Sequence, residues 1–578
     1  MKPRLWMGSG LLVSMACASG PSSRTNIQRG SSASPQMQAE ATRAVKKPAD
    51  SVQPRALVPV VVAMVVDQLA AWVANERFPK LSTQGGFARL VREGTWYRDV
   101  RFAHAITETA PGHASLFSGR TPSEHGIVAN EVLTSGRPAA ILLDPNTKLV
   151  DTAGIRADVG SSMAMLAGDV VADRFKERNP NGTVVALSIK DRGAIFGGGH
   201  HPDLTLWYDS ITGAFVSSTA FTNELPAWLA PLVTPDTVTA RIAQSWALQD
   251  PAKPTFSLTQ DDQAGEGDFA NLGRVFPHSN KGSTKPFAAY RINPDSDRIL
   301  LELALSALDH VVKNGPILLA ISLSANDYIG HIFGPDSWEA WDELQRLDAA
   351  LAWFFGELDR KRGAEHWSAI LSADHGVAPL PEVSRALAKE SHHEPHKPLS
   401  GSRPELITER VLVSEVEKTS MAMAKQALGK GDWIAAVVDP YVYLSQAAKL
   451  LPGPRRNQLM RNLETSLHKK FGVAKLYDTA AMPSPCPSRE SESLDTLACN
   501  SIHPGHGGDF FIALRPGYFF DTGYVSGAGT SHGNAGIYDR AVPILVRNPG
   551  HIPAGKVVDA PQSFTLYASE IEKLSGLR

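Results

Sequence analysis

A threonine stands in the stretch of this chain best suited to covalent chemistry. Thr109 directly precedes Ala110–His113 and the start of an expected helix. A free hydroxyl is a weak nucleophile that needs activation by a metal ion or a base. The amides at a helix N-terminus would favour an anion in front of it. Because threonine also often caps a helix, a purely structural role for Thr109 stays open on these residues alone.

Six carboxylate and imidazole side chains lie where they could hold metal ions. Five of them follow apolar segments, and the sixth lies in a Gly/Ser-rich loop; they are Asp67, Asp327, His331, Asp374, His375 and His532. Zinc binds both ligand types, and three protein ligands leave a position open for substrate. One such pair could equally cap a helix or form a salt bridge. The repeated placement favours two three-ligand sites and metal-assisted phosphoryl transfer.

Three further side chains could bind the oxygens of an anion. Lys190 and Arg192 follow another apolar segment and would project similarly if the extended chain continued. Lysine offers a point charge and arginine a planar fork. Asn130 could donate from its side-chain amide. The alternatives are a solvated strand end for the two cations and a turn for Asn130.

The apolar segments predict the strands that position these residues. Continuous apolar runs are typical of strands buried on both faces of a parallel sheet. The runs are Val58–Val66, Thr183–Ile189, Pro316–Leu323 and Trp367–Ser372, with a late strand at Val542–Val546. Helices are expected at Gly85–Glu93, Ser337–Arg362 and Arg455–Phe471. In such α/β sheets, sites form at the carboxyl ends of the strands.

Two long segments interrupt this alternation, at about 200–295 and 377–510. We predict that both are insertions that build a cap or a second subdomain. The second contains strand-like Ile434–Val438 and Tyr441–Leu444. It also holds Cys486 and Cys499. Because disulfides form in exported proteins, we predict a disulfide between these two residues, and two free thiols are the alternative.

Composition and the N-terminus suggest where the protein acts. Its 578 residues are 43% hydrophobic and 20% charged with a net charge of -2, so a nucleic-acid scaffold is disfavoured. Residues 1–19 are expected to be a signal peptide and 20–56 a disordered tether. Cys17 could carry a lipid anchor, or the signal could simply be cleaved. No later apolar run is long enough for a membrane helix.

Seven fragments, taken in order, resemble the alkaline phosphatase superfamily in its phosphodiesterase/nucleotide-pyrophosphatase-like division. Within it they are most similar to exported, phosphate-irrepressible bacterial alkaline phosphatases with a threonine nucleophile. The fragments are MVVDQ, GGFARLVREGTWY, TAPGHASLFSGRTPSEHGIVAN, SIKDRGAIFGGGH, SANDYIGHIFGP, SADHGVAPLPE and GTSHG. They extend from about residue 58 to 545, and Ala110 departs from the glycine often found in close relatives.

The resemblance implies a fold and a set of roles. The fold is a three-layer α/β/α sandwich with a mostly parallel central sheet and inserted cap segments, over residues 57–578. Thr109 matches the nucleophile. One zinc site matches Asp327, His331 and His532, and the other matches Asp67, Asp374, His375 and Thr109. The phosphate would be held by Asn130, Lys190, Arg192 and the Ala110 amide.

The implied reaction is hydrolysis of phosphate monoesters with two zinc ions and a phosphothreonine intermediate. Expected substrates are sugar phosphates and nucleotides, and the enzyme is expected to be a periplasmic or secreted monomer, contacting a membrane only through an anchor on Cys17. The alternative is a phosphodiesterase or nucleotide pyrophosphatase on the same metal core. Lys190 and Arg192 favour the monoesterase, because a terminal phosphate carries more charge than a diester.

Overall fold

A computed structural model describes residues 59–250, 259–310, 313–390, 403–404, 406–521 and 524–576. The predicted signal peptide at 1–19, its Cys17 and the tether at 20–56 lie outside these described residues. The described residues belong to one compact unit, Leu57–Arg578. None of the described helices has the length and apolar character needed to cross a membrane.

Parallel strands form the centre of a twelve-stranded sheet, ordered β19-β2-β18-β11-β1-β10-β7-β8-β9-β5-β6 with β20 beside β2. The central strands are β11 (Trp367–Ser372), β1 (Val60–Val66), β10 (Ile317–Leu323) and β7 (Thr183–Ser188). They coincide with the four predicted strands. Every residue of β1 and β10 is buried, which explains why these segments are apolar throughout.

Both flanks of the sheet contain antiparallel pairs. On one side β18 (Ala541–Arg547), the predicted late strand, runs antiparallel to β11 and to β2 (Thr95–Arg101). On the other side lie β8 (Leu204–Tyr208), β9 (Phe215–Ser218), β5 (Leu143–Asp151) and β6 (Gly154–Ser161). The prediction that 200–295 is an insertion that builds a cap or a second subdomain is therefore wrong for its first part. Buried β8 pairs in parallel with β7 and extends the sheet.

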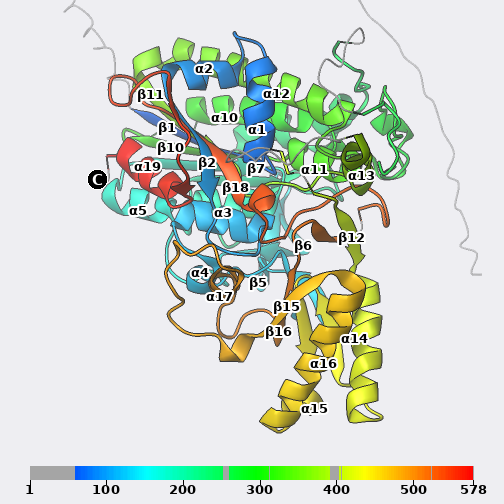
Figure 1. Ribbon diagram of the computed structural model, residues 1–578. Helices are drawn as coiled ribbons and strands as arrows, with labels where there is room; N and C mark the ends of the chain where they lie inside the picture. The colour runs from blue at the N-terminus through cyan, green and yellow to red at the C-terminus, as the bar shows by residue number, and fades with distance from the viewer. Residues whose placement is uncertain are drawn as a thin grey trace, which may run out of the picture. The chain divides into compact units, whose positions relative to one another are not determined.

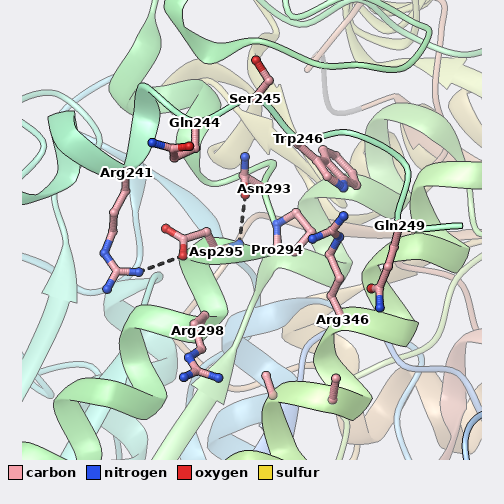
Figure 2. A pocket seen from close by; sticks show the side chains of 12 residues that line it. Arg241, Gln244, Ser245, Trp246, Gln249, Asn293, Pro294, Asp295, Arg298 and Arg346 are labelled. Carbon is pink, nitrogen blue, oxygen red and sulfur yellow. Dashed lines mark hydrogen bonds and ion pairs between the residues drawn. The ribbon is translucent and has the colours of Figure 1, made fainter.

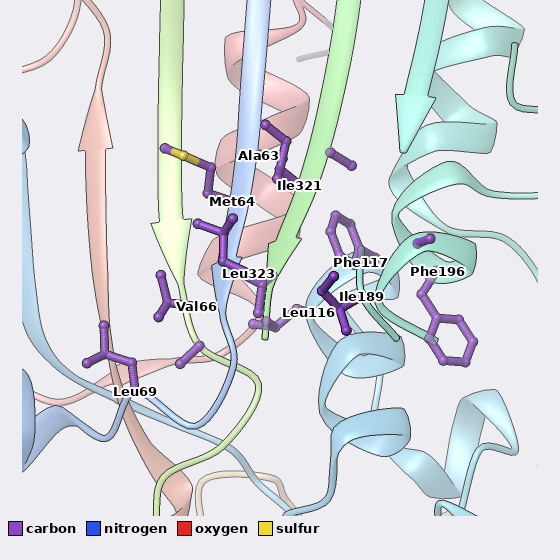
Figure 3. Close-up of a cluster of buried hydrophobic side chains, with 14 of the residues drawn as sticks. Ala63, Met64, Val66, Leu69, Leu116, Phe117, Ile189, Phe196, Ile321 and Leu323 are labelled. Atoms are coloured by element: carbon purple, nitrogen blue, oxygen red, sulfur yellow. The ribbon is translucent and has the colours of Figure 1, made fainter. Parts of the chain in front are cut away.

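Helices cover both faces of the sheet, so the predicted three-layer sandwich is confirmed (Figure 1). One layer contains α2 (Gly86–Glu93), α10 (Asp295–His310) and α12 (Trp338–Arg362). The opposite layer contains α3 (Thr109–Ser118), α5 (Val171–Arg178), α6 (Asp191–Gly198) and α19 (Leu566–Leu574). Figure 3 shows Phe117 of α3 and Phe196 of α6 in the same apolar cluster as Met64 and Ile321 of the central strands.

A smaller sheet forms most of the second interrupting segment. Its strands are β13 (Ile434–Val438), β14 (Tyr441–Leu444), β16 (Phe510–Leu514) and β15 (Val473–Asp478). It has a hydrophobic core of its own with α14 (Val413–Leu428) and α16 (Gly453–Phe471). We call residues 409–514 the cap subdomain. The predicted disulfide between Cys486 and Cys499 is present in it.

A parallel pair, β12 (Glu409–Leu412) with β17 (Tyr518–Asp521), connects the start of the cap subdomain to the chain that follows it. The other α-helices and strands of the described residues are α1 (Ala71–Arg77), α4 (Pro122–His125), β3 (Glu131–Thr134), β4 (Arg137–Ala140), α7 (Ala230–Val233), α8 (Pro235–Ile242), α9 (Pro286–Tyr290), α11 (Ala325–Phe333), α13 (Pro381–Glu390), α15 (Gln446–Lys449), α17 (Leu494–Ser501), α18 (Ile537–Arg540), β19 (Lys556–Val558) and β20 (Gln562–Ser563).

Candidate active site

The carboxyl ends of the central strands bring the predicted ligands together. Asp67 follows β1 directly, Asp374 and His375 follow β11, and α11 carries Asp327 and His331 after β10. His532 reaches the same edge from the loop before β18. All six side chains are buried. Residues scattered over more than 460 positions of the chain therefore meet at one edge, as parallel topology requires.

The first group of candidate ligands contains Asp67, Asp374 and His375, whose ligand atoms lie within 4.8 Å of one another. His375 Nε2 is 3.5 Å from Asp67 Oδ1 and 3.4 Å from Asp374 Oδ2. The hydroxyl of Thr109 lies 3.5 Å from the same nitrogen. This group has the composition expected for the zinc site that includes the nucleophile.

The second group meets around Asp327. His331 Nε2 lies 3.2 Å from Asp327 Oδ1, and His532 Nε2 lies 3.8 Å from the same oxygen. His375 also comes within 4.8 Å of Asp327 and His532, and its ring stacks on that of His532 at 3.6 Å between centroids. The two groups are thus adjacent, with His375 at their border.

The orientation of the three imidazoles fits metal binding. Each Nδ1 lies within hydrogen-bond distance of a backbone carbonyl, at 3.0, 2.8 and 2.6 Å for His375, His331 and His532. A carbonyl only accepts, so each Nδ1 is the donor in its bond and each Nε2 is left to face the ligand groups. Burial lowers the pKa of His375 and His532, which keeps both neutral. In a neutral imidazole the Nε2 carries a lone pair. This lone pair and a carboxylate oxygen that faces it repel each other unless a cation lies between them.

The surroundings of the Asp67 carboxylate also favour a bound cation. No described residue forms a hydrogen bond to its Oδ1. Burial, together with the charges of Asp327 and Asp374, raises the pKa of Asp67 well above its usual range. A carboxylate so placed is stabilised by a divalent cation. The donor set of carboxylates and imidazoles suits zinc.

Lys190 lies between the two groups and beside the nucleophile. Its Nζ is 2.7 Å from Asp67 Oδ2 and 2.5 Å from Asp327 Oδ2, and it donates to Thr109 Oγ1 at 3.2 Å. Burial alone would lower the pKa of Lys190, but Asp327 and Asp67 outweigh it and raise that pKa above its usual range. The side chain is therefore an ammonium at alkaline pH.

Lys190 and Arg192 reach the site by a different route from the one predicted. The extended chain does not continue after β7, because Lys190 caps α6 and Arg192 lies in its first turn. Both side chains nevertheless line one cavity of about 610 Å³ above Thr109. The condition of the prediction, an extended chain that continues past β7, is not met, because the chain turns into a helix at this point.

Asn130 also contacts the nucleophile segment. Its Oδ1 accepts a hydrogen bond from the Ala110 N–H at 2.8 Å. The Ala110 amide, expected to face a phosphate, is thus bonded to Asn130 in this structure. With Oδ1 engaged, the side-chain NH₂ of Asn130 is the group left to donate, and Asn130 lines the same cavity as Lys190.

Two residues at the site were not predicted from the sequence. Gln68 donates its backbone N–H to Asp374 Oδ1 at 3.1 Å and its side-chain amide to Asp327 Oδ1 at 2.9 Å. Its φ is 66°, a left-handed conformation that is strained for a non-glycine residue. Glu108 accepts from the backbone N–H of Asn130 at 2.5 Å. Adjacency to Asp67 and Thr109 was the one available signal for each.

A second cavity, of about 500 Å³, has a different character (Figure 2). Arg241, Arg298 and Arg346 line it, which suggests an anion site at first sight. Each guanidinium is already paired with a carboxylate, at 2.8, 3.0 and 2.5 Å. Their charge is therefore neutralised within the protein, and the cavity above Thr109 remains the candidate active site.

Comparison with known proteins matches the chain to one family and to several relatives. The family model for type I phosphodiesterase/nucleotide pyrophosphatase matches residues 61–524. The alkaline phosphatase PafA of Elizabethkingia meningoseptica is 28% identical over 499 residues, 84% of this chain and 86% of that protein. The alkaline phosphatase PhoV of Synechococcus elongatus is 33% identical over 335 residues, 56% of this chain and 60% of that protein.

A solved structure shares the fold. The crystal structure of wild-type alkaline phosphatase PafA superposes with a TM-score of 0.75 at 27% sequence identity. The match covers 91% of this chain and 97% of that one. The chain therefore shares the overall fold of that protein.

Proposed function

The chain belongs to the type I phosphodiesterase/nucleotide pyrophosphatase family, and on that premise we propose that it is an exported alkaline phosphatase that hydrolyses phosphate monoesters. Two relatives that match it carry the name alkaline phosphatase. The residues gathered around Thr109 support the same reaction, because they combine a nucleophile, two sets of metal ligands and cations for a phosphate.

Two zinc ions would be held by the adjacent ligand groups. Asp67, Asp374, His375 and Thr109 would hold one, and Asp327, His331 and His532 the other. Zinc bound there would act as a Lewis acid that lowers the pKa of the Thr109 hydroxyl and stabilises the leaving oxygen. The protonated Nδ1 of each imidazole, held by a backbone carbonyl, fixes Nε2 toward the ligand groups.

The residues of the chain carry the two chemical steps. Thr109 Oγ1 gives its proton to solvent and attacks phosphorus, and the bond to the leaving oxygen breaks; that oxygen takes a proton from water, which gives phosphothreonine and an alcohol. Water then attacks that phosphothreonine, which restores the hydroxyl and releases inorganic phosphate. In both steps Lys190, Arg192 and Asn130 would hold the equatorial oxygens, where charge is spread in the transition state.

The contact of Lys190 with Thr109 is the observation that carries the monoester assignment. Its Nζ lies 3.2 Å from Thr109 Oγ1, so it would meet an oxygen of any phosphate under attack. Arg192 lines the same cavity. Two cations suit a dianionic terminal phosphate better than a singly charged diester. The alternative is a phosphodiesterase, which the family description itself favours.

The decisive experiment compares kcat/KM for p-nitrophenyl phosphate and bis-p-nitrophenyl phosphate, with zinc-loaded enzyme at alkaline pH. We expect the monoester to be preferred. The double variant Lys190→Ala/Arg192→Ala should lose at least about a hundredfold more activity on the monoester than on the diester. The matched control is Arg360→Ala/Lys418→Ala, which removes two exposed cations.

Two outcomes would contradict the proposal. A wild-type preference for the diester would move the function to phosphodiesterase on the same metal core. Equal losses on both substrates would remove the role given to Lys190 and Arg192.

Sugar phosphates and nucleotides are the proposed natural substrates. The proposed location is periplasmic or secreted, as a monomer with Cys17 as the one point of membrane anchoring.

A further inference from the structure

The cavity above Thr109 has an acidic wall that the phosphate chemistry does not use. Glu108, Glu131 and Asp439 line it together with the cations that would hold the phosphate. None of the three belongs to a candidate metal group of the described residues, since their ligand atoms do not converge closely enough. An organic group of the substrate is therefore the better occupant for this wall.

Two carboxylate oxygens in the wall lack partners. Glu108 is 5% exposed, and its Oε2 accepts from the backbone of Asn130. Its Oε1 is buried and has no hydrogen-bond partner among the described residues, and the same holds for Asp439 Oδ1. Burying an acceptor without a donor costs free energy. These oxygens therefore call for a donor supplied by a ligand.

The charges of the wall favour a cation as that donor. Burial and the charge of Glu131 raise the pKa of Asp439 to about 8, and no basic side chain lowers it. Lys190 is already paired with Asp67 and Asp327, and Arg192, the other cation lining the cavity, interacts with Glu108 and not with Asp439. A positively charged ligand group would relieve the repulsion between Asp439 and Glu131 and donate to the oxygens that lack partners.

The remaining lining sets the length and polarity of the ligand between its charged ends. Leu412, Val413, Val437 and Val438 of the cap subdomain face the same cavity. A short alkyl chain would pack on these side chains, with phosphate on the cationic floor and a positive group at the acidic wall.

We propose that the preferred substrates are phosphate monoesters whose leaving group carries an ammonium, that is, short aminoalkyl phosphates. This inference rests on the proposed monoesterase function. It assigns Glu108, Glu131 and Asp439 to recognition of the leaving group, a role separate from metal binding and from contacts to the phosphate.

The test compares kcat/KM for 2-aminoethyl phosphate and for n-propyl phosphate, a neutral compound of similar shape, at pH 8. The wild type should prefer the amine by about tenfold, the scale of one hydrogen bond to a charged group. Asp439→Asn and Glu131→Gln should each lower this ratio. Asp432→Asn, which changes a carboxylate of the cap subdomain that is 94% exposed, should keep it.

The outcomes distinguish a failure of this inference from a failure of the proposed function. A wild-type ratio near one, with both esters cleaved, would overturn the acidic wall as a recognition element and leave the monoesterase intact. A ratio unchanged in Glu131→Gln and Asp439→Asn would do the same. Failure to cleave either ester would overturn the proposed function and this inference together. Glu131 lies at an exposed position of β3, so its variant tests the idea even if Asp439→Asn does not fold.

Discussion

The reaction proposed for this chain depends on one hydroxyl. Thr109 is buried, with its Oγ1 between Lys190 Nζ at 3.2 Å and His375 Nε2 at 3.5 Å. Thr109→Ala removes the nucleophile and leaves the helix start intact. Turnover of p-nitrophenyl phosphate should fall by at least about a thousandfold. Zinc content and the thermal unfolding midpoint should stay close to those of the wild type, measured on the same preparations.

A matched control separates loss of the nucleophile from loss of any threonine. Thr239 lies exposed on α8 and bonds only to the backbone in the described residues. Thr239→Ala should keep wild-type turnover. Substantial activity in Thr109→Ala would mean that water attacks the ester directly, and the phosphothreonine step would have to be abandoned.

Gln68 should matter for metal binding although it offers no metal ligand. It donates to Asp374 and to Asp327, one carboxylate from each ligand group. Gln68→Ala removes the bond to Asp327 Oδ1, and zinc affinity should fall about 10- to 100-fold. Competition with a chelator of known affinity would measure this. Unchanged zinc affinity would show that Asp327 is held in place without Gln68.

The metal ligands and Gln68 differ in how visible they are in the sequence. Asp67 and Asp374 stand just after apolar runs, so their placement at the sheet edge could be predicted from strand periodicity alone. The role of Gln68 depends on its φ of 66° and on partners 259 and 306 positions away. No local pattern encodes either property. The same holds for Glu108, whose partner Asn130 lies on a loop.

Helices α10 and α12 place a buried carboxyl pair behind the site. Asp297 of α10 accepts from the backbone N–H groups of Ser324 and Ala325 at 2.8 and 3.2 Å, and so caps the start of α11, the helix of Asp327. Neither oxygen of Glu343 on α12 has a hydrogen-bond partner in the described part of the chain. Burial raises the pKa of Asp297 to about 7, and burial with Asp297 raises that of Glu343.

This pair should make stability depend on pH. A carboxyl whose pKa is raised in the folded state binds its proton more tightly there than in the unfolded chain. Its stabilising contribution is complete below the unfolded pKa and is lost as the pH rises through the folded pKa. Glu343→Gln stays neutral at every pH. The unfolding free energy of the wild type should therefore fall relative to this variant, by roughly 1 to 3 kcal/mol between pH 5 and pH 9.

Denaturant unfolding of both proteins across that range would measure the difference. The matched control is Glu365→Gln, in an exposed position, which should follow the wild type at each pH. A constant difference between Glu343→Gln and the wild type would show that Glu343 ionises without penalty in the folded protein.

Single elements could be predicted well from the sequence, and their pairing could not. Strands β1, β7, β10 and β11 and helices α12 and α16 begin and end within two residues of the predicted bounds. The cysteine pair was predictable from cysteine number and export. The addition of β8 and β9 to the central sheet was not predictable, because the sequence of a strand indicates that it is buried and does not indicate which strand lies beside it.

Folding of the whole unit concentrates negative charge at one edge of the sheet. Asp67, Asp327 and Asp374 are all buried there, and Lys190 is paired with two of them. Lysine alone does not balance three carboxylates, and bound zinc would supply the rest. Removal of zinc should therefore weaken the entire fold. Binding at a thousand times Kd stabilises a protein by about 4 kcal/mol for each ion.

Zinc and Lys190 should therefore share the task of neutralising these carboxylates. Chelation should lower the unfolding midpoint of the wild type and abolish turnover, and added zinc should restore both. Lys190→Ala should cost more stability in the chelated protein than in the zinc-loaded one, because without zinc Lys190 is the cation in contact with Asp67 and Asp327. Calorimetric unfolding of the four samples would measure this coupling. Equal losses with and without zinc would mean that Lys190 and the metal neutralise different charges, and Lys190 would then act on the phosphate alone.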